Sequence, residues 1–314
     1  MAEKFDGIVI KSTGSWYSVL APSTGEVVRC RLRGQFRLKE SRATNPVAVG
    51  DHVTVESCGP AHEDAAIVEI ATRRNYLIRR ASNLSKESHI IAANIDQVYV
   101  IATIDHPPTS PEFIDRVLVT AQAYDIPATI LVNKTDLLQS REKLEALDAL
   151  SSIYTGAGYP VEHISAVTGK GVDALRAEMR DKVSLLTGNS GVGKSTLINA
   201  LDPSLSARVG EISEYHNRGR HTTTFSEIFP LTGGGLLIDT PGIKGFGLID
   251  IGNEELYRYF PELMKYSEDC QFYNCTHVHE PGCAVVEAVG QGKISLPRYE
   301  SYLKMLDDDD KYRK

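Results

Sequence analysis

The sequence predicts a multidomain protein whose three parts differ in secondary structure: an all-β barrel, then an α/β domain, then a small, mainly helical domain. Three observations predict this order. Residues 1–75 hold short runs rich in Val and Ile, and residues from 90 to about 250 alternate between strand-like and helical runs. Residues from about 252 onward are mainly helical around clustered cysteines, with helices expected over NEELYRYFPELM and ISLPRYESYLKML. We predict the domains 1–75, 76–250 and 251–314.

The first part contains strand-like runs separated by Gly, Pro, Ser and Asn: GIVIKSTGSWYSVLA, EVVRCRLRG, DHVTVESC and AIVEIA. Several short strands within about seventy residues favour a small closed barrel, such as the oligonucleotide-binding (OB) fold. An SH3-like barrel, or an added domain without a ligand, is the alternative, because strand patterns alone rarely fix a topology.

A basic stretch, RRNYLIRRASNLSK, follows these strands. It carries Tyr76 and the basic residues Arg73, Arg74, Arg79, Arg80 and Lys86. Basic side chains with an interleaved aromatic ring suit contact with a nucleic-acid backbone. A linker with solvated charges is the alternative.

The middle part alternates between the two kinds of element. The expected strands are QVYVIATI, PATILVNK, VEHIS, VSLLTG and GGLLIDT, and the expected helices begin at Ser110 and cover REKLEALDALSSIY, VDALRAEMR and STLINAL. Ser110 offers a capping hydroxyl, Pro111 suits the first helical position, and Glu112 places an acid near the positive end of the helix. This alternation predicts a doubly wound α/β sheet.

A phosphate-binding signature, GNSGVGKST, lies where a predicted strand turns into a helix, and it fits the pattern G-x-x-x-x-G-K-[ST]. Its glycines let backbone N–H groups converge on phosphate oxygens at the start of the helix. We expect Lys194 to reach the β and γ phosphates, Ser195 to ligate Mg²⁺, and Thr196 to support the α phosphate. A glycine-rich structural turn is the alternative. The predicted phosphate-binding residues are Gly188, Asn189, Ser190, Gly191, Val192, Gly193, Lys194, Ser195 and Thr196.

Two further loops predict guanine specificity. NKTD follows the strand PATILV, and SAVTGKG follows the next strand. We expect Asn133 to bond the Hoogsteen edge of guanine, Asp136 to accept from N1–H and the exocyclic amine, and the Ala166 N–H to contact O6. NKTD alone also fits an ordinary strand-to-helix turn, but two such loops on successive strands favour guanine. The residues predicted to line the base are Asn133, Lys134, Thr135, Asp136, Ser165 and Ala166.

The switch motifs come last. DTPG ends the strand GGLLI, and RGRHTTTF lies between DTPG and the phosphate loop. We expect Asp239 to hold Mg²⁺ through a water and the Gly242 N–H to meet the γ phosphate. Thr223 is the predicted Mg²⁺ ligand of switch I, with its two neighbouring threonines as alternatives. The motifs therefore follow the cyclic order of a P-loop GTPase from a different starting point, which predicts a circularly permuted domain.

Water activation needs a residue other than the usual glutamine. The DTPG glycine is followed by Ile243, which cannot orient the attacking water as a glutamine does in Ras-like GTPases. His221 lies beside the switch I threonines and can accept or donate a hydrogen bond. A histidine that only contacts RNA or orders switch I is the alternative. Gly191 occupies the position of an Asn through which some GTPases recruit K⁺, so that ligand is absent.

The clustered cysteines form the pattern C-x₄-C-x-H-x₅-C. The candidate ligands are Cys270, Cys275, His277 and Cys283. Three thiolates and one imidazole suit a closed tetrahedral Zn²⁺ site, whose role is structural because no position is left for a substrate. His279 is the competing nitrogen ligand, and unligated cysteines are the other alternative.

The motifs NKTD, GNSGVGKST, GRHTTT and DTPG, in this order, resemble those of the ribosome-small-subunit-dependent GTPase A family (RsgA, also called YjeQ). The resemblance covers nearly the whole chain and implies an OB barrel, a circularly permuted GTPase domain and a C-terminal zinc domain. It implies a catalytic role for His221 and favours His277 over His279 as the zinc ligand. It also implies a factor in late 30S subunit maturation whose hydrolysis of GTP to GDP is stimulated by that subunit.

Composition limits the classes of partner that the protein is expected to bind. The net charge of -7 argues against a generic nucleic-acid coat protein, although local basic patches can still bind RNA phosphates. The chain has no apolar run long enough for a bilayer and no signal-peptide pattern at its start, so we expect a cytoplasmic monomer without a membrane partner. The expected partners are the 30S subunit and its 16S rRNA, and the expected cofactors are GTP or GDP with Mg²⁺ and one structural Zn²⁺.

Two other functions remain open at this point. One is a permuted GTPase that acts on another RNA or on a protein. The other is a nucleotide-gated RNA-binding module with negligible hydrolysis. In either case switch II runs from about Ile243 into the zinc domain with almost no linker, so we expect a movement driven by the γ phosphate to reorient that domain.

Overall fold

The computed structural model describes residues 3–33, 46–57, 65–80, 88–205, 227–239 and 251–307. These residues belong to two compact units. The first unit comprises Met1–Gln97, Leu175–Leu186 and Leu201–Ile243, and the second comprises Val98–Ala174, Thr187–Ala200 and Lys244–Lys314. Within the described ranges, no helix has both the length and the apolarity needed to span a bilayer.

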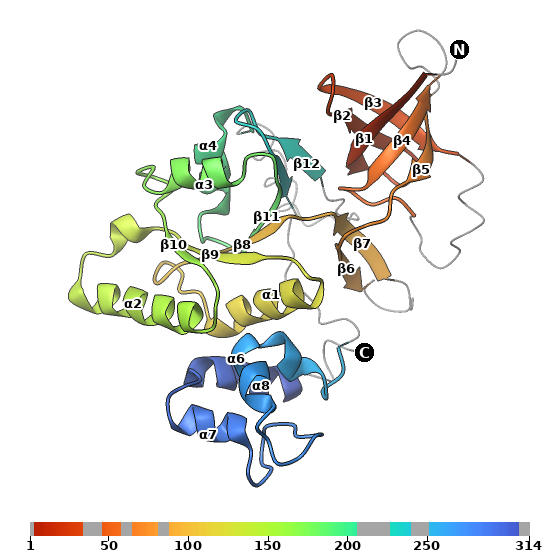
Figure 1. The fold of residues 1–314 in the computed structure, drawn as a ribbon. Helices are drawn as coiled ribbons and strands as arrows, with labels where there is room; N and C mark the ends of the chain where they lie inside the picture. The colour runs from red at the N-terminus through yellow and green to blue at the C-terminus, as the bar shows by residue number, and fades with distance from the viewer. Residues whose placement is uncertain are drawn as a thin grey trace. The chain divides into compact units, whose positions relative to one another are not determined.

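The first unit begins with a closed barrel (Figure 1). Its strands are β1 (Glu3–Ser12), β2 (Tyr17–Ala21), β3 (Glu26–Leu32), β4 (His52–Ser57) and β5 (Ala66–Ile70). They pair in the order β1-β2-β3-β5-β4, and β4 pairs with β1 to close the barrel. The pairing of β3 with β5 is parallel, and the other barrel pairings are antiparallel. This closed arrangement confirms the predicted OB-like barrel.

The barrel core follows from side-chain alternation along its strands. Every second residue of a strand points to the same face. In β3, Val28 and Cys30 are therefore buried, whereas Arg29 and Arg31 are exposed. Burial raises the pKa of the Cys30 thiol to about 12, so Cys30 packs as a neutral side chain.

The basic stretch after the barrel enters a two-stranded antiparallel hairpin, β6 (Tyr76–Arg80) and β7 (Ser88–Ala93). Arg73 binds the buried Asp51 with two hydrogen bonds, Nε to Oδ1 at 2.7 Å and Nη2 to Oδ2 at 2.8 Å. Arg74 pairs with Asp96, Nη2 to Oδ1 at 2.6 Å. Both arginines are thus paired with carboxylates of the protein, Arg73 largely buried and Arg74 at an exposed position. Lys86 and the side chains of Arg79 and Arg80 lie outside the described residues.

The first unit also contains β11 (Val183–Gly188) up to Leu186, β12 (Glu227–Pro230) and β13 (Leu236–Asp239). Strand β11 pairs parallel with β13, and β12 pairs antiparallel with β13. Strand β12, which the sequence analysis did not predict, meets the barrel strand β1 where Lys11 faces Glu227. The two side chains form an ion pair of 2.9 Å.

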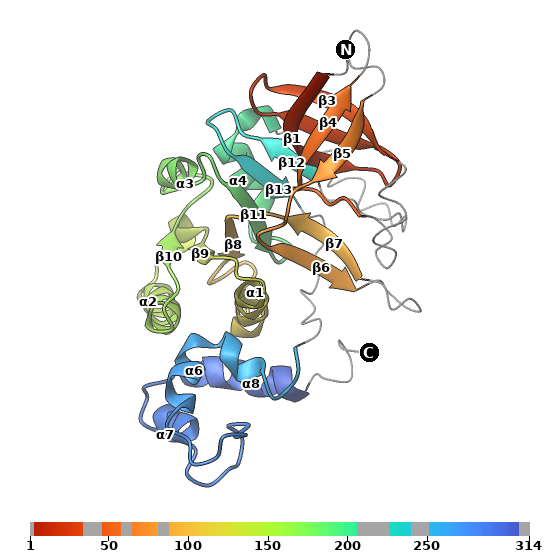
Figure 2. The ribbon, with the colours of Figure 1, turned by 45° about the vertical axis from the view of Figure 1, so that its right-hand side comes forward.

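The second unit is built on three parallel strands, β8 (Gln97–Ala102), β9 (Ala128–Val132) and β10 (Val161–His163), in the order β10-β9-β8. Every residue of β8 and β9 is buried, as expected for parallel strands that are covered on both faces. Figures 1 and 2 show α1 (Pro111–Ala123) and α2 (Arg141–Gly156) along these strands. The remaining helices here are α3 (Val172–Glu178) and α4 (Lys194–Leu201).

Helix α1 begins as its sequence predicts. The Ser110 hydroxyl accepts a hydrogen bond from the Phe113 N–H at 3.3 Å, and Pro111 is the first helical residue. Ser140 caps α2 in the same way, through the Lys143 N–H at 3.3 Å. These caps fix where the loops after β8 and β9 end.

The C-terminal helices are α6 (Pro261–Ser267), α7 (Ala284–Gly290) and α8 (Leu296–Asp307), preceded by a 3₁₀ turn at Leu256–Tyr259. Helix α8 and this turn lie against α1 (Figure 2). The helix predicted over NEELYRYFPELM is broken at Pro261, because proline cannot donate the hydrogen bond that a continuous helix requires at that position. Helix α7 was not predicted.

A buried charge cluster joins these helices to α1. Arg298 on α8 is fully buried; its Nε lies 2.6 Å from Glu262 Oε1 on α6, and its Nη1 lies 2.7 Å from Asp115 Oδ1 on α1. Its guanidinium carbon lies 4.7 Å from the centre of the Phe260 ring. Burial alone lowers the pKa of Arg298, but the two carboxylates outweigh burial and raise that pKa.

Candidate functional site

The phosphate-binding signature forms the loop between β11 and α4, as predicted. Gly191 and Gly193 adopt φ values of +86° and +92°, which favour glycine. A Cβ atom on Gly193 would lie 2.5 Å from Nδ2 of Asn133, and one on Gly188 would lie 2.9 Å from the carbonyl oxygen of Ile101. The loop therefore needs glycine both for its backbone conformation and for its contact with β8 and with NKTD.

Asn133 connects this loop to both guanine loops. Its Nδ2 donates to the Val192 carbonyl at 2.9 Å, and its Oδ1 accepts from the Ala166 N–H at 3.0 Å. The side chain is 2 % exposed. The sequence analysis assigned Asn133 and the Ala166 N–H to the guanine base and did not foresee that they bind each other.

Lys134 crosses from NKTD to the phosphate loop. Its φ is +63°, and its Nζ donates to the Gly191 carbonyl at 2.7 Å. The same Nζ donates to the carbonyl of His106, in the loop between β8 and α1. The sequence analysis did not single out His106. The available signal was its position in DHPP directly after a buried parallel strand, because ligands of α/β sheets bind outside the carboxyl ends of the strands.

Asp136 is oriented by the second guanine loop. The Ser165 hydroxyl donates to Asp136 Oδ1 at 2.6 Å and accepts from the Thr168 N–H at 3.2 Å. The Thr135 hydroxyl donates to the Ile164 carbonyl at 2.9 Å. Hydrogen bonds between protein groups thus join NKTD to SAVTGKG.

The other predicted residues divide into two groups. Asn189, Ser190, Ser195 and Thr196 are exposed at the phosphate loop and the start of α4, and Lys194 beside them is partly buried. Asp239 ends β13, but its side chain, together with His221, Thr223 and Gly242, lies outside the described residues. The structure thus brings the phosphate and guanine loops together within one unit, and the switch assignments stay predictions.

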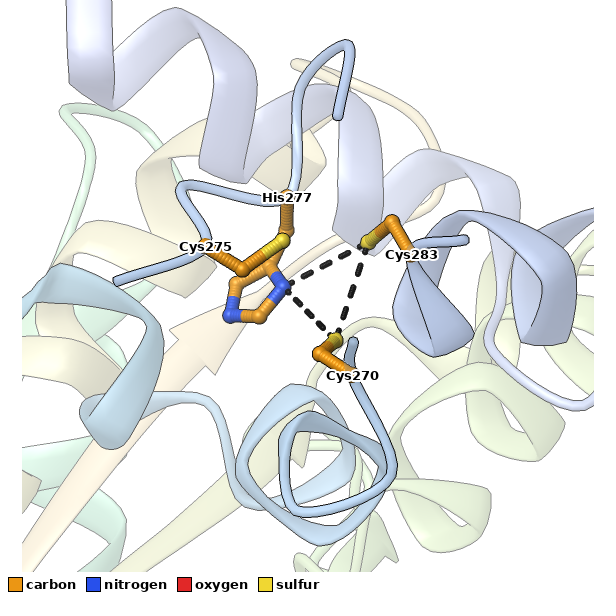
Figure 3. A group of neighbouring side chains, drawn as sticks. All are labelled: Cys270, Cys275, His277 and Cys283. Atoms are coloured by element: carbon orange, nitrogen blue, oxygen red, sulfur yellow. Dashed lines mark hydrogen bonds between the residues drawn. The ribbon is translucent and has the colours of Figure 1, made fainter. Parts of the chain in front are cut away.

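The four candidate zinc ligands converge (Figure 3). His277 Nδ1 lies 3.6 Å from the Cys270 sulfur and 3.5 Å from the Cys283 sulfur, and these two sulfurs are 3.9 Å apart. All four ligand atoms, that of Cys275 included, lie within 4.8 Å of one another. A tetrahedral Zn²⁺ with Zn–S of about 2.3 Å and Zn–N of about 2.0 Å spaces its ligand atoms by about 3.5–3.8 Å. The cluster therefore fits zinc.

The loop that carries the ligands is held from inside the domain. The Glu280 carboxylate accepts from the Thr276 hydroxyl at 2.5 Å and from the Val278 N–H at 3.1 Å, and the Tyr299 hydroxyl donates to the His277 carbonyl at 2.7 Å. Burial raises the pKa of Glu280, but these hydrogen bonds outweigh burial and hold that pKa well below its usual range. His279 is exposed and outside the cluster, so His277 is the nitrogen ligand that the geometry supports.

Comparison with known families assigns the two larger parts of the chain. Residues 70–249 match the model of the RsgA GTPase family, and residues 6–63 match that of the RsgA N-terminal domain. The chain is 55% identical over 309 residues to a Bacteroides fragilis protein named small ribosomal subunit biogenesis GTPase RsgA. It is 51% identical over 311 residues to a Porphyromonas gingivalis protein of that name. Each comparison covers 98% of both chains.

Solved structures agree with this assignment. The crystal structure of YjeQ from Thermotoga maritima matches with a TM-score of 0.79 and 34% identity, over 98% of each chain. The structure of YloQ, described as a circularly permuted GTPase, matches with a TM-score of 0.76 and 29% identity, over 99% of this chain and 98% of that one. The motif order, the converging loops and these matches agree. The chain belongs to the RsgA family of circularly permuted GTPases, which hydrolyse GTP.

Proposed function

We propose that this GTPase acts in late maturation of the 30S ribosomal subunit, to which it binds through 16S rRNA and which stimulates its hydrolysis of GTP. The observation that carries the proposal is the 51–55% identity, over nearly the whole chain, to proteins named as small ribosomal subunit biogenesis GTPases. This role implies a cytoplasmic protein, and we further propose that it works as a monomer without a membrane partner. We retain 1–75, 76–250 and 251–314 as its functional domains.

The nucleotide site is proposed to use the residues that the motifs name. The backbone N–H groups of residues 188–193 and Lys194 bind the phosphates, and NKTD with Ser165 and Ala166 binds guanine. Ser195 and Thr223 ligate Mg²⁺, with Asp239 acting through a water and the Gly242 N–H at the γ phosphate. The convergence of the phosphate and guanine loops on Asn133 and Lys134 supports this assignment.

His221 is proposed to orient the attacking water, because Ile243 cannot. The metal centre is proposed to hold one structural Zn²⁺ through its three thiolates and His277 Nδ1. A closed tetrahedral shell leaves no position for a substrate, so the zinc supplies folding free energy to the C-terminal domain.

One exposed group on the barrel supports RNA contact. The guanidinium groups of Arg29 and Arg31 both lie over the ring of Trp16, each at 4.1 Å from its centroid. Both arginines are exposed. Arginine combined with an aromatic ring suits the phosphates and the stacked bases of single-stranded RNA. Since Arg73 and Arg74 are paired within the protein, we assign the RNA contact to the barrel and not to these two arginines.

The direct test of the function is GTP hydrolysis by the full chain alone, with 30S subunits, and with 50S subunits or tRNA as controls. We expect stimulation by 30S subunits only. In His221→Ala we expect nearly normal GTP binding and a loss of stimulated turnover of roughly 10²-fold, the scale of a positioned acid–base group. Absence of stimulation by 30S subunits contradicts the ribosome assignment, and equal turnover in the variant contradicts the role of His221.

The barrel contact has its own test. Arg31→Met is expected to weaken binding to 30S subunits and to reduce the slope of affinity against salt concentration, since each lost phosphate contact lowers that slope by about one. Arg33→Met is the matched control, because Arg33 Nη1 is paired with Glu56 at 2.5 Å. Equal affinity of Arg31→Met and the parent chain contradicts the contact.

A further inference from the structure

The loop between β8 and α1 forms a closed turn. The Thr103 N–H donates to the Thr109 hydroxyl at 3.0 Å, and the Thr109 N–H donates to the Thr103 carbonyl at 2.9 Å. The Thr103 hydroxyl also donates to the Pro107 carbonyl at 2.5 Å. The base of the turn is therefore fixed, and Asp105, His106 and Pro107 lie beyond it.

Pro107 lies beside the phosphate loop at Gly191, and His106 is connected to the same residue through Lys134. Lys134 Nζ donates to both the His106 carbonyl and the Gly191 carbonyl, so it bridges the turn and the loop. A Cβ atom on Gly191 would lie 3.2 Å from Cδ of Pro107, which places the proline ring beside the loop.

Two of the bridging residues have unusual backbones. His106 and Lys134 have φ values of +55° and +63°, in the left-handed region that disfavours residues other than glycine. Such backbones persist where surrounding contacts impose them, and they cluster at functional sites. Here the two residues share one hydrogen bond beside the phosphate loop.

An ion pair anchors the turn from α2. Asp105 Oδ1 accepts from the His106 N–H at 2.8 Å, and Asp105 Oδ2 lies 2.8 Å from Lys143 Nζ. The hydrogen bond from Lys143 is the largest effect that lowers the pKa of Asp105, so the carboxylate is ionised at neutral pH. A polar chain thus runs from Lys143 through Asp105, His106 and Lys134 to the Gly191 carbonyl.

We propose that Asp105, His106 and Pro107, braced by Lys143, form a positioning element that holds the phosphate loop in its nucleotide-binding conformation. The proposal rests on the assignment of residues 188–196 as the phosphate site. Lys134 holds the Gly191 carbonyl away from the place where phosphate binds, which keeps the neighbouring N–H groups directed toward it. Without the brace the loop must be ordered during binding, and part of the binding free energy is lost to that ordering.

The Asp105–Lys143 pair is expected to affect nucleotide affinity more than the stability of the fold. Asp105 and Lys143 are partly exposed, and ion pairs of this kind contribute little to folding. Breaking the pair is therefore expected to weaken the binding of GTP and of GDP by the same factor, with little change in the melting temperature of the protein. The turnover number at saturating GTP should stay within about twofold of the parent value, because bound nucleotide itself orders the loop.

The experiment measures the Kd of GDP and of a non-hydrolysable GTP analogue for the zinc-loaded full chain, its Asp105→Asn and Lys143→Met variants, and the double variant. Each single variant is expected to raise both Kd values by about three- to tenfold, the range of an indirect coupling. The double variant should bind no more weakly than the single variant that has the larger loss of affinity. Lys143→Arg should restore most of the affinity.

Arg141→Met is the matched control, because it breaks the exposed Arg141–Glu145 pair of 2.7 Å on the same helix and should leave both Kd values unchanged. Lys194→Ala tests the underlying site, since it must abolish binding if residues 188–196 hold the phosphates. If Lys194→Ala abolishes binding and the Asp105 and Lys143 variants bind like the parent, the brace is refuted and the site stands. Additive losses in the double variant, or losses that follow the melting temperature, also refute the brace.

Discussion

The nucleotide loops and the zinc centre gather their residues in different ways. Asn133 bonds a carbonyl 59 positions away in the phosphate loop and an N–H 33 positions away in the second guanine loop. The outermost zinc ligands, Cys270 and Cys283, are only 13 positions apart. Hydrogen bonds within the protein hold the nucleotide loops together. At the zinc centre, Glu280 and Tyr299 hold the backbone of the ligand loop, but the three buried or partly buried thiols converge on a point that suits a metal. We therefore expect the nucleotide loops to keep their structure when no nucleotide is bound. We expect the zinc centre to lose its structure when the metal is removed.

Metal removal is the largest expected effect. Cys283 is both a candidate zinc ligand and the N-cap of α7, where its sulfur accepts from the Val286 N–H at 3.5 Å. Chelation, or Cys283→Ser, should unfold the C-terminal domain, because apparent zinc binding free energies in small domains reach about 10 kcal/mol or more. Circular dichroism and zinc content measure this. Cys30→Ser, which changes a buried thiol of the barrel, is the control and should retain the zinc content of the parent chain. A C-terminal domain that stays native after chelation contradicts the zinc dependence.

The next effect concerns the attachment of that domain to α1. Arg298→Met leaves the carboxylates of Asp115 and Glu262 buried without their cation, which costs about 3–5 kcal/mol of unfolding free energy. Denaturant unfolding measures it. Arg258→Met, which breaks an exposed pair of 3.8 Å with Glu255, is the control and should change stability by less than about 1 kcal/mol. A loss as small as that of the control means that the cluster does not hold the helices together.

The same cluster constrains the expected movement of switch II. A reorientation of the C-terminal domain away from α1 has to break the bonds of Arg298, and the domain shares its compact unit with the guanine loops. The movement stays a prediction. Identical solution scattering of the GDP-bound and GTP-analogue-bound forms argues against a large one.

A comparable effect is expected from the connection between the nucleotide loops. Asn133→Ala removes two hydrogen bonds from a buried position and leaves the Val192 carbonyl and the Ala166 N–H without them, at a cost of about 1–3 kcal/mol for each unsatisfied group. The variant should bind GDP more weakly and show faster hydrogen exchange in both loops. Unchanged exchange in residues 188–193 contradicts the role of Asn133 as their link.

The smallest effect is expected at the orientation of Asp136. Ser165→Ala removes the hydrogen bond of 2.6 Å to Asp136 Oδ1. The net contribution of such a bond to the free energy of unfolding is about 1 kcal/mol or less. We expect a modest fall in the preference for GTP over ATP, with stability nearly unchanged, measured by competition binding. Ser165→Thr keeps the hydroxyl and should preserve the preference.

Local patterns predicted most of the elements. Strand-like runs predicted the barrel strands, although β1 and β2 fall within a single predicted run. The cap at Ser110 and the turn at residues 188–194 lie where the sequence places them. The hairpin strands β6 and β7, the strand β12 and the helix α7 were not predicted, because elements of four to seven residues are too short to establish a period.

Contacts between residues far apart in the chain could not be predicted from the sequence. Asp115 and Arg298 are 183 positions apart, and nothing in either local pattern indicates that they meet. Motifs named Asn133 and Lys134 for the base, but their bonds to Val192 and Gly191 depend on the packing of strands, which periodicity does not specify. The convergence of the four candidate zinc ligands was predictable because their spacing is local.

Hydrogen exchange of the full chain, free of nucleotide and measured before and after zinc removal, tests the difference between the two sites most directly. The account predicts that residues 133–136, 165–171 and 188–194 are protected without nucleotide and stay protected after chelation, while residues 270–283 lose their protection. Nucleotide loops that become protected only when GDP is added, or a zinc loop that stays protected after chelation, contradict it.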